Sequence, residues 1–107
     1  MLKKDNLFAD ITKDRTQEQF TDLLNSGNTK VERIVSFGQS SPEHGWYDQS
    51  ETEWVCVLKG YGVLIFENGQ TIRLDVGDHL TIPAHCKHKV IETDASNETL
   101  WLAVFIK

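Results

Sequence analysis

The stretch that decides the fold runs from residue 53 to residue 88. It opens with Glu53–Gly60, EWVCVLKG, and closes with Gly77–His88, GDHLTIPAHCKH. Each half joins an apolar run typical of a strand to a Gly or Pro turn, and each carries a polar side chain able to bind a ligand at its edge. Those side chains are Glu53 and His88. No other part of the chain combines turn residues and chemically active side chains so densely.

Outside this stretch, apolar runs and turn signals continue in both directions. Residues 31–37 alternate in the manner of a strand buried mainly on one face. Asn68-Gly69 is the strongest hairpin signal in the chain, and Lys59-Gly60 has the form of a second two-residue hairpin turn. The expected strands of this region are 53–58, 61–67, 70–74, 79–82, 87–93 and 98–106.

The first 29 residues have a different pattern. Residues 5–11 alternate weakly and predict a short edge strand, whereas Thr16–Asn25 is the only good helix candidate. Thr16 and Gln19 have the spacing of a capping box, and the apolar residues after them fall on one helical face. We therefore expect a single domain in which an N-terminal strand and one short helix precede an antiparallel barrel or sandwich over 30–107.

Size and composition narrow the classes of function. The chain has 107 residues, of which 39% are apolar and 25% charged, as in an ordinary globular domain. Its net charge of −5 argues against binding to a nucleic-acid backbone, which needs a clustered positive face. No apolar run approaches the roughly 20 residues of a membrane span, and the first residues do not form a signal-peptide core. We therefore expect neither nucleic acid nor membrane as a partner.

The two cysteines indicate a reducing compartment. Cys56 and Cys86 are too far apart for a CxxC motif and too few for a secreted disulfide framework. Both lie in apolar, strand-like surroundings, where a free thiol behaves as a small buried apolar group. The sequence thus favours the cytoplasm.

Two spacings in the central stretch resemble the cupin superfamily. Glu53, six residues and Gly60 resemble the end of the first cupin motif, whereas Gly77–His88, with Pro83 and His85 inside it, resembles the second. The segment Ser41–Gln49 is similar to one in a group of small single-domain cupins. The resemblance implies an antiparallel jelly-roll barrel of six to eight strands, commonly dimeric, with a pocket inside it. The implied partners are a small molecule and a second copy of the chain.

The same resemblance implies a metal site with a changed ligand set. Cupins usually bind a metal through two His and a Glu of the first motif and one His of the second, and Glu53 and His88 fill the last two positions. Two histidines are missing before Glu53, because the corresponding positions hold Tyr47 and Gln49 in one alignment and Trp46 and Asp48 in another. His44 lies at the distance from Gly38 that the first His requires, but too far upstream of Glu53. The expected ligands are therefore Glu53, His88 and one of His44, Asp48 or Gln49.

Several interpretations remain open at this point. Iron, manganese, nickel or zinc would suit a carboxylate and imidazole site, in an enzyme resembling an isomerase or a dioxygenase. The missing histidines favour a metal-free barrel that binds a small molecule or a protein. Trp46 and Tyr47 are candidates for the pocket mouth, where an aromatic ring stacks on a ligand. His85 follows a Pro-Ala turn, where it either lines the pocket or supplies a positive φ angle.

Overall fold

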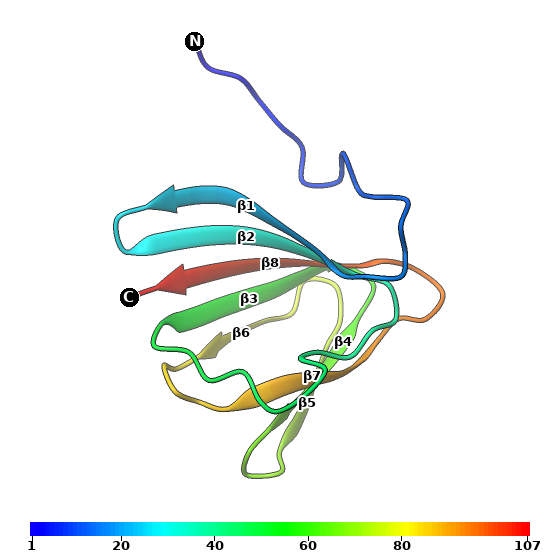
Figure 1. Cartoon of the computed structure of the whole chain (residues 1–107), viewed down its shortest axis with the longest axis vertical. Coiled ribbons are helices and arrows are strands. Elements are labelled where there is room, and N and C mark those ends of the chain that lie inside the picture. The colour runs from blue at the N-terminus through cyan, green and yellow to red at the C-terminus, as the bar shows by residue number, and fades with distance from the viewer.

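The computed structural model describes all residues from Met1 to Lys107 and contains eight strands and no helix. Five strands form one sheet in the order β1-β2-β8-β3-β6, and three form a second sheet in the order β5-β4-β7. Every pair of neighbouring strands is antiparallel (Figure 1). The strands are β1 (Gln19–Ser26), β2 (Thr29–Ser36), β3 (Thr52–Lys59), β4 (Gly62–Phe66), β5 (Thr71–Leu74), β6 (His79–Ile82), β7 (His88–Thr93) and β8 (Thr99–Ile106).

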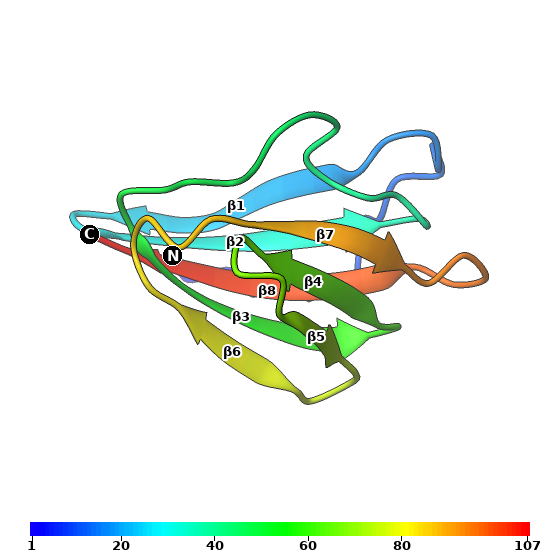
Figure 2. The same cartoon turned by 90° about the horizontal axis from the view of Figure 1, so that it is seen from below.

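The two sheets face each other and enclose the core between them (Figure 2). Side chains alternate along each strand, so that one face of each sheet points inward. Trp101, Ala103 and Phe105 of β8 are on the inner face of the large sheet and are buried. The core cluster consists of Val55, Val57, Leu64, Phe66, Leu74, Ile82, Trp101, Ala103 and Phe105. This is the predicted jelly-roll barrel.

The predicted N-terminal helix is wrong. Residues 19–26 form β1, which pairs with β2 and is interrupted by an irregularity between Asp22 and Leu24. A helix of about ten residues is only marginally stable alone, whereas pairing with β2 satisfies the backbone along the whole segment. The expected capping box is absent as well, because Thr16 bonds to Asp14 and the Gln19 side chain bonds to the backbone of residues 10 and 12.

Two further predictions about turns and strands need correction. Residues 5–11 form no strand but turns and irregular chain. Lys59-Gly60 is not a hairpin turn, because β3 belongs to the large sheet and β4 to the small one. Gly60 has a φ angle of 74°, and a Cβ there would lie 2.7 Å from the carbonyl oxygen of Glu98, so the chain crosses tightly between the sheets. The Asn68-Gly69 hairpin between β4 and β5 is confirmed.

A buried arginine attaches the N-terminal segment to the large sheet. Arg33 of β2 is only 4% exposed, and its guanidinium donates hydrogen bonds to the carbonyl oxygens of Leu7, Ala9 and Asp10. The guanidinium has five donors in a fixed planar arrangement, so it can reach several carbonyls at once. The segment before β1 is thereby tied to β2. No helix with the length and apolar character of a membrane crossing is present.

The loop between β2 and β3 closes one side of the barrel. Ser41 pairs with Val90, and Tyr47 pairs with His88, as isolated bridges to β7. The Tyr47 amide donates to the His88 carbonyl at 2.8 Å, and the His88 amide donates back at 3.1 Å. The loop therefore follows the edge of the small sheet, and its residues Ser41, Tyr47, Gln49 and Glu51 line the barrel interior.

Candidate functional site

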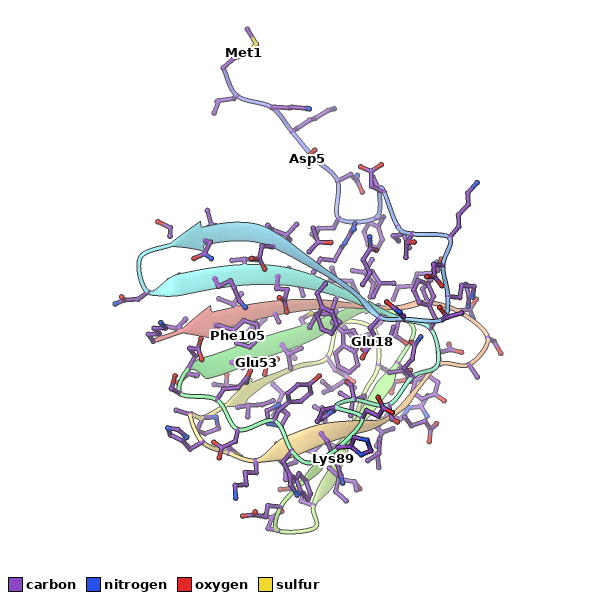
Figure 3. All side chains as sticks on the ribbon, in the orientation of Figure 1. Met1, Asp5, Glu18, Glu53, Lys89 and Phe105 are labelled. Carbon is purple, nitrogen blue, oxygen red and sulfur yellow. The ribbon has the colours of Figure 1, made fainter.

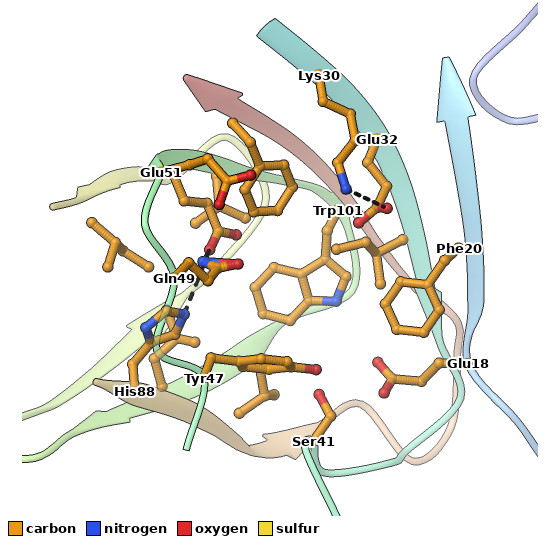
Figure 4. Close-up of a pocket in the computed structure, with 17 residues that line it drawn as sticks. Glu18, Phe20, Lys30, Glu32, Ser41, Tyr47, Gln49, Glu51, His88 and Trp101 are labelled. Carbon is orange, nitrogen blue, oxygen red and sulfur yellow. Dashed lines mark hydrogen bonds and ion pairs between the residues drawn. The ribbon is translucent and has the colours of Figure 1, made fainter. Parts of the chain in front are cut away.

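A cavity of about 180 Å³ lies between the two sheets and opens beside β1 (Figure 4). The large sheet supplies most of its wall, β7 and the loop before β3 supply the opposite side, and Trp101 lies between them. Its lining includes nine apolar side chains and a high proportion of carboxylates. The lining residues are Glu18, Phe20, Lys30, Glu32, Ile34, Ser41, Tyr47, Gln49, Glu51, Glu53, Val55, Leu64, Ile82, His88, Val90, Trp101 and Phe105.

The two ligand candidates of the central stretch meet in this cavity. Glu53 lies on β3, where its partners on the neighbouring strands are Phe105 of β8 and Ile82 of β6. Figure 3 shows the positions of Glu53 and Phe105. His88 begins β7 on the facing sheet. The Nε2 atom of His88 is 3.5 Å from Oε1 of Glu53, and both residues are less than 10% exposed. An ionisable pair withdrawn from water in this way interacts more strongly than one at the surface.

Hydrogen bonding fixes the proton on one nitrogen of His88. Its Nδ1 atom is 2.8 Å from the carbonyl oxygen of Cys86, which can only accept a hydrogen bond, so Nδ1 carries a proton. Nε2 is thus the nitrogen that gains or loses a proton, and it faces Glu53. Rings of Tyr47 and Phe66 flank the imidazole, with centroids 5.6 and 6.0 Å away. The geometry is that of an oriented acid–base pair.

The charge of Glu53 also changes the pKa of His88. Burial alone lowers the pKa of this imidazole, but the hydrogen bonds to Glu53 and to the Cys86 carbonyl, with the negative charge of Glu53, raise it above 6.5. The protonated form is therefore stabilised in the folded protein. Gln49 adds a donor to the same carboxylate, because its Nε2 atom is 3.1 Å from Oε1 of Glu53.

A second polar chain lies on the other side of Trp101. The indole Nε1 donates to the Ser36 hydroxyl at 3.2 Å, and that hydroxyl donates to the Glu18 carboxylate at 2.7 Å. Glu18 belongs to the segment before β1 and reaches the cavity because Ser36 ends β2 beside it. Burial raises the pKa of the nearby Tyr47 phenol, and the negative charges of Glu18 and Glu53 raise it further.

The third charged group of the cavity is an ion pair on β2. Lys30 and Glu32 are two residues apart on the inner face, and their charged atoms are 3.7 Å apart. The Lys30 ammonium also lies 4.8 Å from the centre of the Phe105 ring. Burial raises the pKa of the Glu32 carboxyl, and the positive charge of Lys30 opposes that change.

The structure brings together only some of the predicted site residues. Glu53, His88, Gln49 and Tyr47 line the cavity. The remaining four predicted residues, which are His44, Trp46, Asp48 and His85, are not among its lining residues.

Each of these four residues has other contacts on the outside of the barrel. The side chain of His44 is 93% exposed. Trp46 lies under the ammonium of Lys89, at 4.4 Å from the ring centre. Asp48 turns to His85, with 2.8 Å between Oδ1 and Nδ1. His85 has a φ angle of 60°, so it supplies the positive φ of its turn.

The donor atoms present do not fit a resident divalent metal. Catalytic metal sites of this chemistry use three or more protein ligands. Glu53 and His88 approach each other in the cavity, but no group of three or more His, Cys, Asp or Glu side chains lies close enough together to hold a metal ion. Gln49, the third predicted ligand that lines the cavity, turns its amide nitrogen to Glu53.

Sequence reasoning missed four charged residues of the cavity, which are Glu18, Lys30, Glu32 and Glu51. The alternation of β2 contained a signal for two of them, because Lys30, Glu32 and Ile34 all lie on one face of a strand. Glu18 was hidden by the helical interpretation of its segment. Glu51 stands in a loop, where nothing in the sequence indicates the direction of a side chain.

The comparisons with known proteins agree with this architecture. The family model described as "Cupin domain" matches residues 32–105, so the chain belongs to the cupin family. A crystal structure from Ralstonia eutropha JMP134, described as a proposed mannose-6-phosphate isomerase, is 41% identical, covers 99% of both chains and has a TM-score of 0.92. No curated protein matches the chain.

Two more distant structures share the fold. A cupin superfamily protein from Desulfitobacterium hafniense DCB-2 is 21% identical over 90% of this chain and 83% of its own, with a TM-score of 0.74. An RmlC-like cupin from Desulfovibrio desulfuricans is 20% identical over 98% of this chain and 97% of its own, also with a TM-score of 0.74. These likenesses establish the fold alone. The Ralstonia protein matches over the full length of both chains.

Proposed function

We propose that this cupin binds a small polar organic molecule in its barrel cavity and that Glu53 and His88 contact it without a resident metal. The observation that carries the proposal is the buried Glu53–His88 pair at the wall of a cavity large enough for a small molecule. Ligand sites in proteins are typically concave and mostly apolar, with a few convergent polar groups. A histidine whose pKa is shifted by a neighbouring carboxylate, as that of His88 is by Glu53, is typical of such sites.

The pair also suits proton transfer. His88 is oriented by the Cys86 carbonyl and turns Nε2 toward Glu53, so a proton bound to Nε2 lies beside the carboxylate. A bound molecule in contact with both groups could lose a proton to one and gain a proton from the other. Proton abstraction and return of this kind is the chemistry of many isomerases. This supports an isomerase-like reaction as the first enzymatic activity to assay.

The name of the Ralstonia relative suggests a specific substrate, a sugar phosphate. Phosphate recognition in proteins relies on Arg or Lys side chains or on the amides of a helix N-terminus. The cavity has one lysine, Lys30, which already pairs with Glu32, and the fold has no helix. We therefore propose binding of a small polar molecule rather than of a phosphorylated sugar.

Thermal-shift screening tests the proposal. Wild-type protein is heated with sugars, nucleotides, organic acids and amines, with and without a chelator. We expect at least one class of compound to raise the melting temperature equally in both conditions, because a ligand that binds only the folded state stabilises it. The Glu53→Gln variant is expected to lose most of that shift, and the Glu43→Gln variant, changed at an exposed loop position, to keep it.

Two results would contradict the proposal. The first is that no compound stabilises the wild-type protein, or that Glu53→Gln responds as strongly as wild type. The second is that stabilisation disappears with chelator and that the purified protein carries a stoichiometric metal. Elemental analysis of protein prepared without chelator distinguishes this second case.

A further inference from the structure

The charges that line the cavity do not balance. Four carboxylates and two basic groups line it. The two basic groups are already paired, because Lys30 lies 3.7 Å from Glu32 and His88 lies 3.5 Å from Glu53. Glu18 and Glu51 form no ion pair and accept hydrogen bonds only from serine hydroxyls. The cavity therefore has an excess of negative charge that the protein itself does not neutralise.

One carboxylate oxygen deep in the cavity has no partner in the protein. Glu53 is 8% exposed, and its contacts to Gln49 and to His88 both involve Oε1. Its Oε2 atom accepts no hydrogen bond from the protein. This oxygen is also not fully enclosed by protein atoms. The remaining accessible space beside Glu53 is the cavity, so Oε2 faces it. A buried carboxylate oxygen open to a cavity is a good acceptor for an N–H or O–H donor of a ligand.

Aromatic faces surround the same space. Phe20, Tyr47, Trp101 and Phe105 line the cavity, and Figure 4 shows Phe20, Tyr47 and Trp101 around its centre. A cation is attracted to the face of an aromatic ring, more strongly where water is excluded. The cavity already contains one example, because the Lys30 ammonium lies 4.8 Å from the centre of the Phe105 ring and beside the Glu32 carboxylate. Carboxylates combined with aromatic faces suit a positively charged group.

We propose that the ligand of this cavity is a small organic cation, a molecule with a protonated amine that contacts the unpaired carboxylates and the aromatic walls. This inference rests on the proposed function, because it assigns a chemical class to the ligand of the same cavity. The amine donates hydrogen bonds to acceptor-only carboxylates, which Glu18, Glu51 and the free oxygen of Glu53 provide. An anionic ligand meets the same carboxylates as repulsive charges and finds no free cation.

Three molecules of similar shape and different charge test the inference. n-Butylamine, n-butanol and butanoate carry charges of about +1, 0 and −1 near neutral pH, as amines and carboxylic acids do. Binding of each to the full-length protein is measured by chemical-shift titration at low salt. We expect butylamine to bind about tenfold more tightly than butanol, a difference of the size that a desolvated cation–π contact and a charge-assisted hydrogen bond supply. Butanoate is expected to bind most weakly.

Two substitutions and one control identify the groups responsible. Glu18→Gln and Glu51→Gln each remove one unpaired carboxylate and keep the size of the side chain. Each variant is expected to bind butylamine several-fold more weakly than wild type and to bind butanol equally well. Glu51 lies in a loop and its carboxylate accepts only a local hydrogen bond, so we expect Glu51→Gln to fold. It therefore still tests the inference if Glu18→Gln fails to fold. Glu43→Gln, at a loop side chain that is 92% exposed, is the matched control and should leave both affinities unchanged.

The possible results separate this inference from the proposed function. If butanol or butanoate binds as tightly as butylamine, or if only molecules outside the amine class bind, the cation inference is wrong while the cavity remains a ligand site. If the two cavity variants bind butylamine as wild type does, the assigned carboxylates are wrong and the inference fails. If neither these molecules nor any compound of the thermal-shift screen binds, the proposed function itself fails.

Discussion

The two nitrogens of His88 face different partners, and this difference makes the residue sensitive to pH. Nδ1 is held by the Cys86 carbonyl, whereas Nε2 faces Glu53. Because its pKa in the folded protein is raised above 6.5, protonation of His88 stabilises the fold. That contribution is fully present below pH 6.5 and is lost as the pH rises through the raised pKa.

The difference in stability between wild type and His88→Gln should therefore depend on pH. Wild type is expected to be more stable than the variant below pH 6.5, and this advantage should shrink as the pH rises above that value. Urea denaturation at a series of pH values measures it, and an NMR titration of the imidazole gives the pKa directly. His44→Gln, in which an exposed histidine is replaced, is the control and should show no such trend. A constant difference across the pH series would contradict the prediction.

Gly62 is a second residue on which the cavity depends. A Cβ at this position would lie 2.1 Å from Cη2 of Trp101, so the indole that separates the two halves of the cavity packs directly on the glycine. Its backbone does not have a positive φ angle, and the requirement for glycine is therefore purely steric. The Gly62→Ala variant must displace the Trp101 ring or the strand.

We expect Gly62→Ala to destabilise the protein by about 1–3 kcal/mol, the usual cost of overpacking a core. Tryptophan fluorescence should change as well, because the ring that moves is a tryptophan. Gly69→Ala provides a comparison, since Gly69 has a φ angle of 90° and no atom near its missing Cβ. It should lose stability through backbone strain without a change in fluorescence. Equal fluorescence changes in both variants would contradict the assigned packing.

At the scale of the elements, the strands with strong local signals could be predicted, and those that depend on distant partners could not. The Asn68-Gly69 turn specifies its hairpin within four residues, so β4 and β5 were foreseen. β1 was mistaken for a helix because its local capping pattern is good, and only pairing with β2 explains the strand. Lys59-Gly60 has a hairpin sequence, yet the partners of β3 are β6 and β8. Local sequence does not specify which sheet a strand joins.

In the candidate site too, residues within sequence motifs could be predicted, whereas residues positioned by contacts with distant parts of the chain could not. The resemblance to the two cupin motifs implies a shared pocket for Glu53 and His88, and in the structure both residues line the cavity. The orientation of a loop side chain is set by its contacts, and in the structure His44 is exposed and Asp48 turns to His85 rather than into the cavity. Glu18 could not be found, since it reaches the cavity only through the pairing of β1 with β2 and its hydrogen bond from Ser36.

Arg33 links β2 to the segment before β1 and supports another prediction. Its guanidinium bonds to three backbone carbonyls and has no carboxylate partner. Arg33→Lys keeps the charge but cannot reach all three carbonyls, because the ammonium is a single compact donor group. We expect a loss of about 1–3 kcal/mol in the free energy of unfolding, as for a lost hydrogen bond to a charged group.

Amide exchange separates the local from the global effect of Arg33→Lys. Residues 7–12 should exchange faster in the variant, whereas β3 and β8 should keep their relative protection. Lys30→Arg is a control on the inner face of the same strand and should leave the N-terminal segment unchanged. Uniformly faster exchange throughout the barrel, with no excess in the N-terminal segment, would show that Arg33 does not act through that segment.

At the scale of the whole molecule, one long edge of the large sheet remains open. β1 has eight residues and pairs only with β2, so its other side presents unpaired backbone groups. Phe20 and Leu24 on this strand are more than half exposed. An open edge with apolar side chains is where a second copy of a sheet protein can add its own strand. We therefore propose, as the family resemblance implied, that two copies pair, and we place their contact along β1.

Light scattering over a range of concentrations tests this pairing. Wild type is expected to have the mass of a dimer at micromolar concentration, because an added strand brings both backbone hydrogen bonds and apolar contacts. Leu24→Lys places a charge on the edge and should shift the protein to the monomer, as lysine does on natural edge strands. Ile91→Lys changes an exposed apolar residue on β7, outside the proposed contact, and should leave the mass unchanged. A monomeric wild type, or a dimer that Leu24→Lys leaves intact, would contradict a contact along β1.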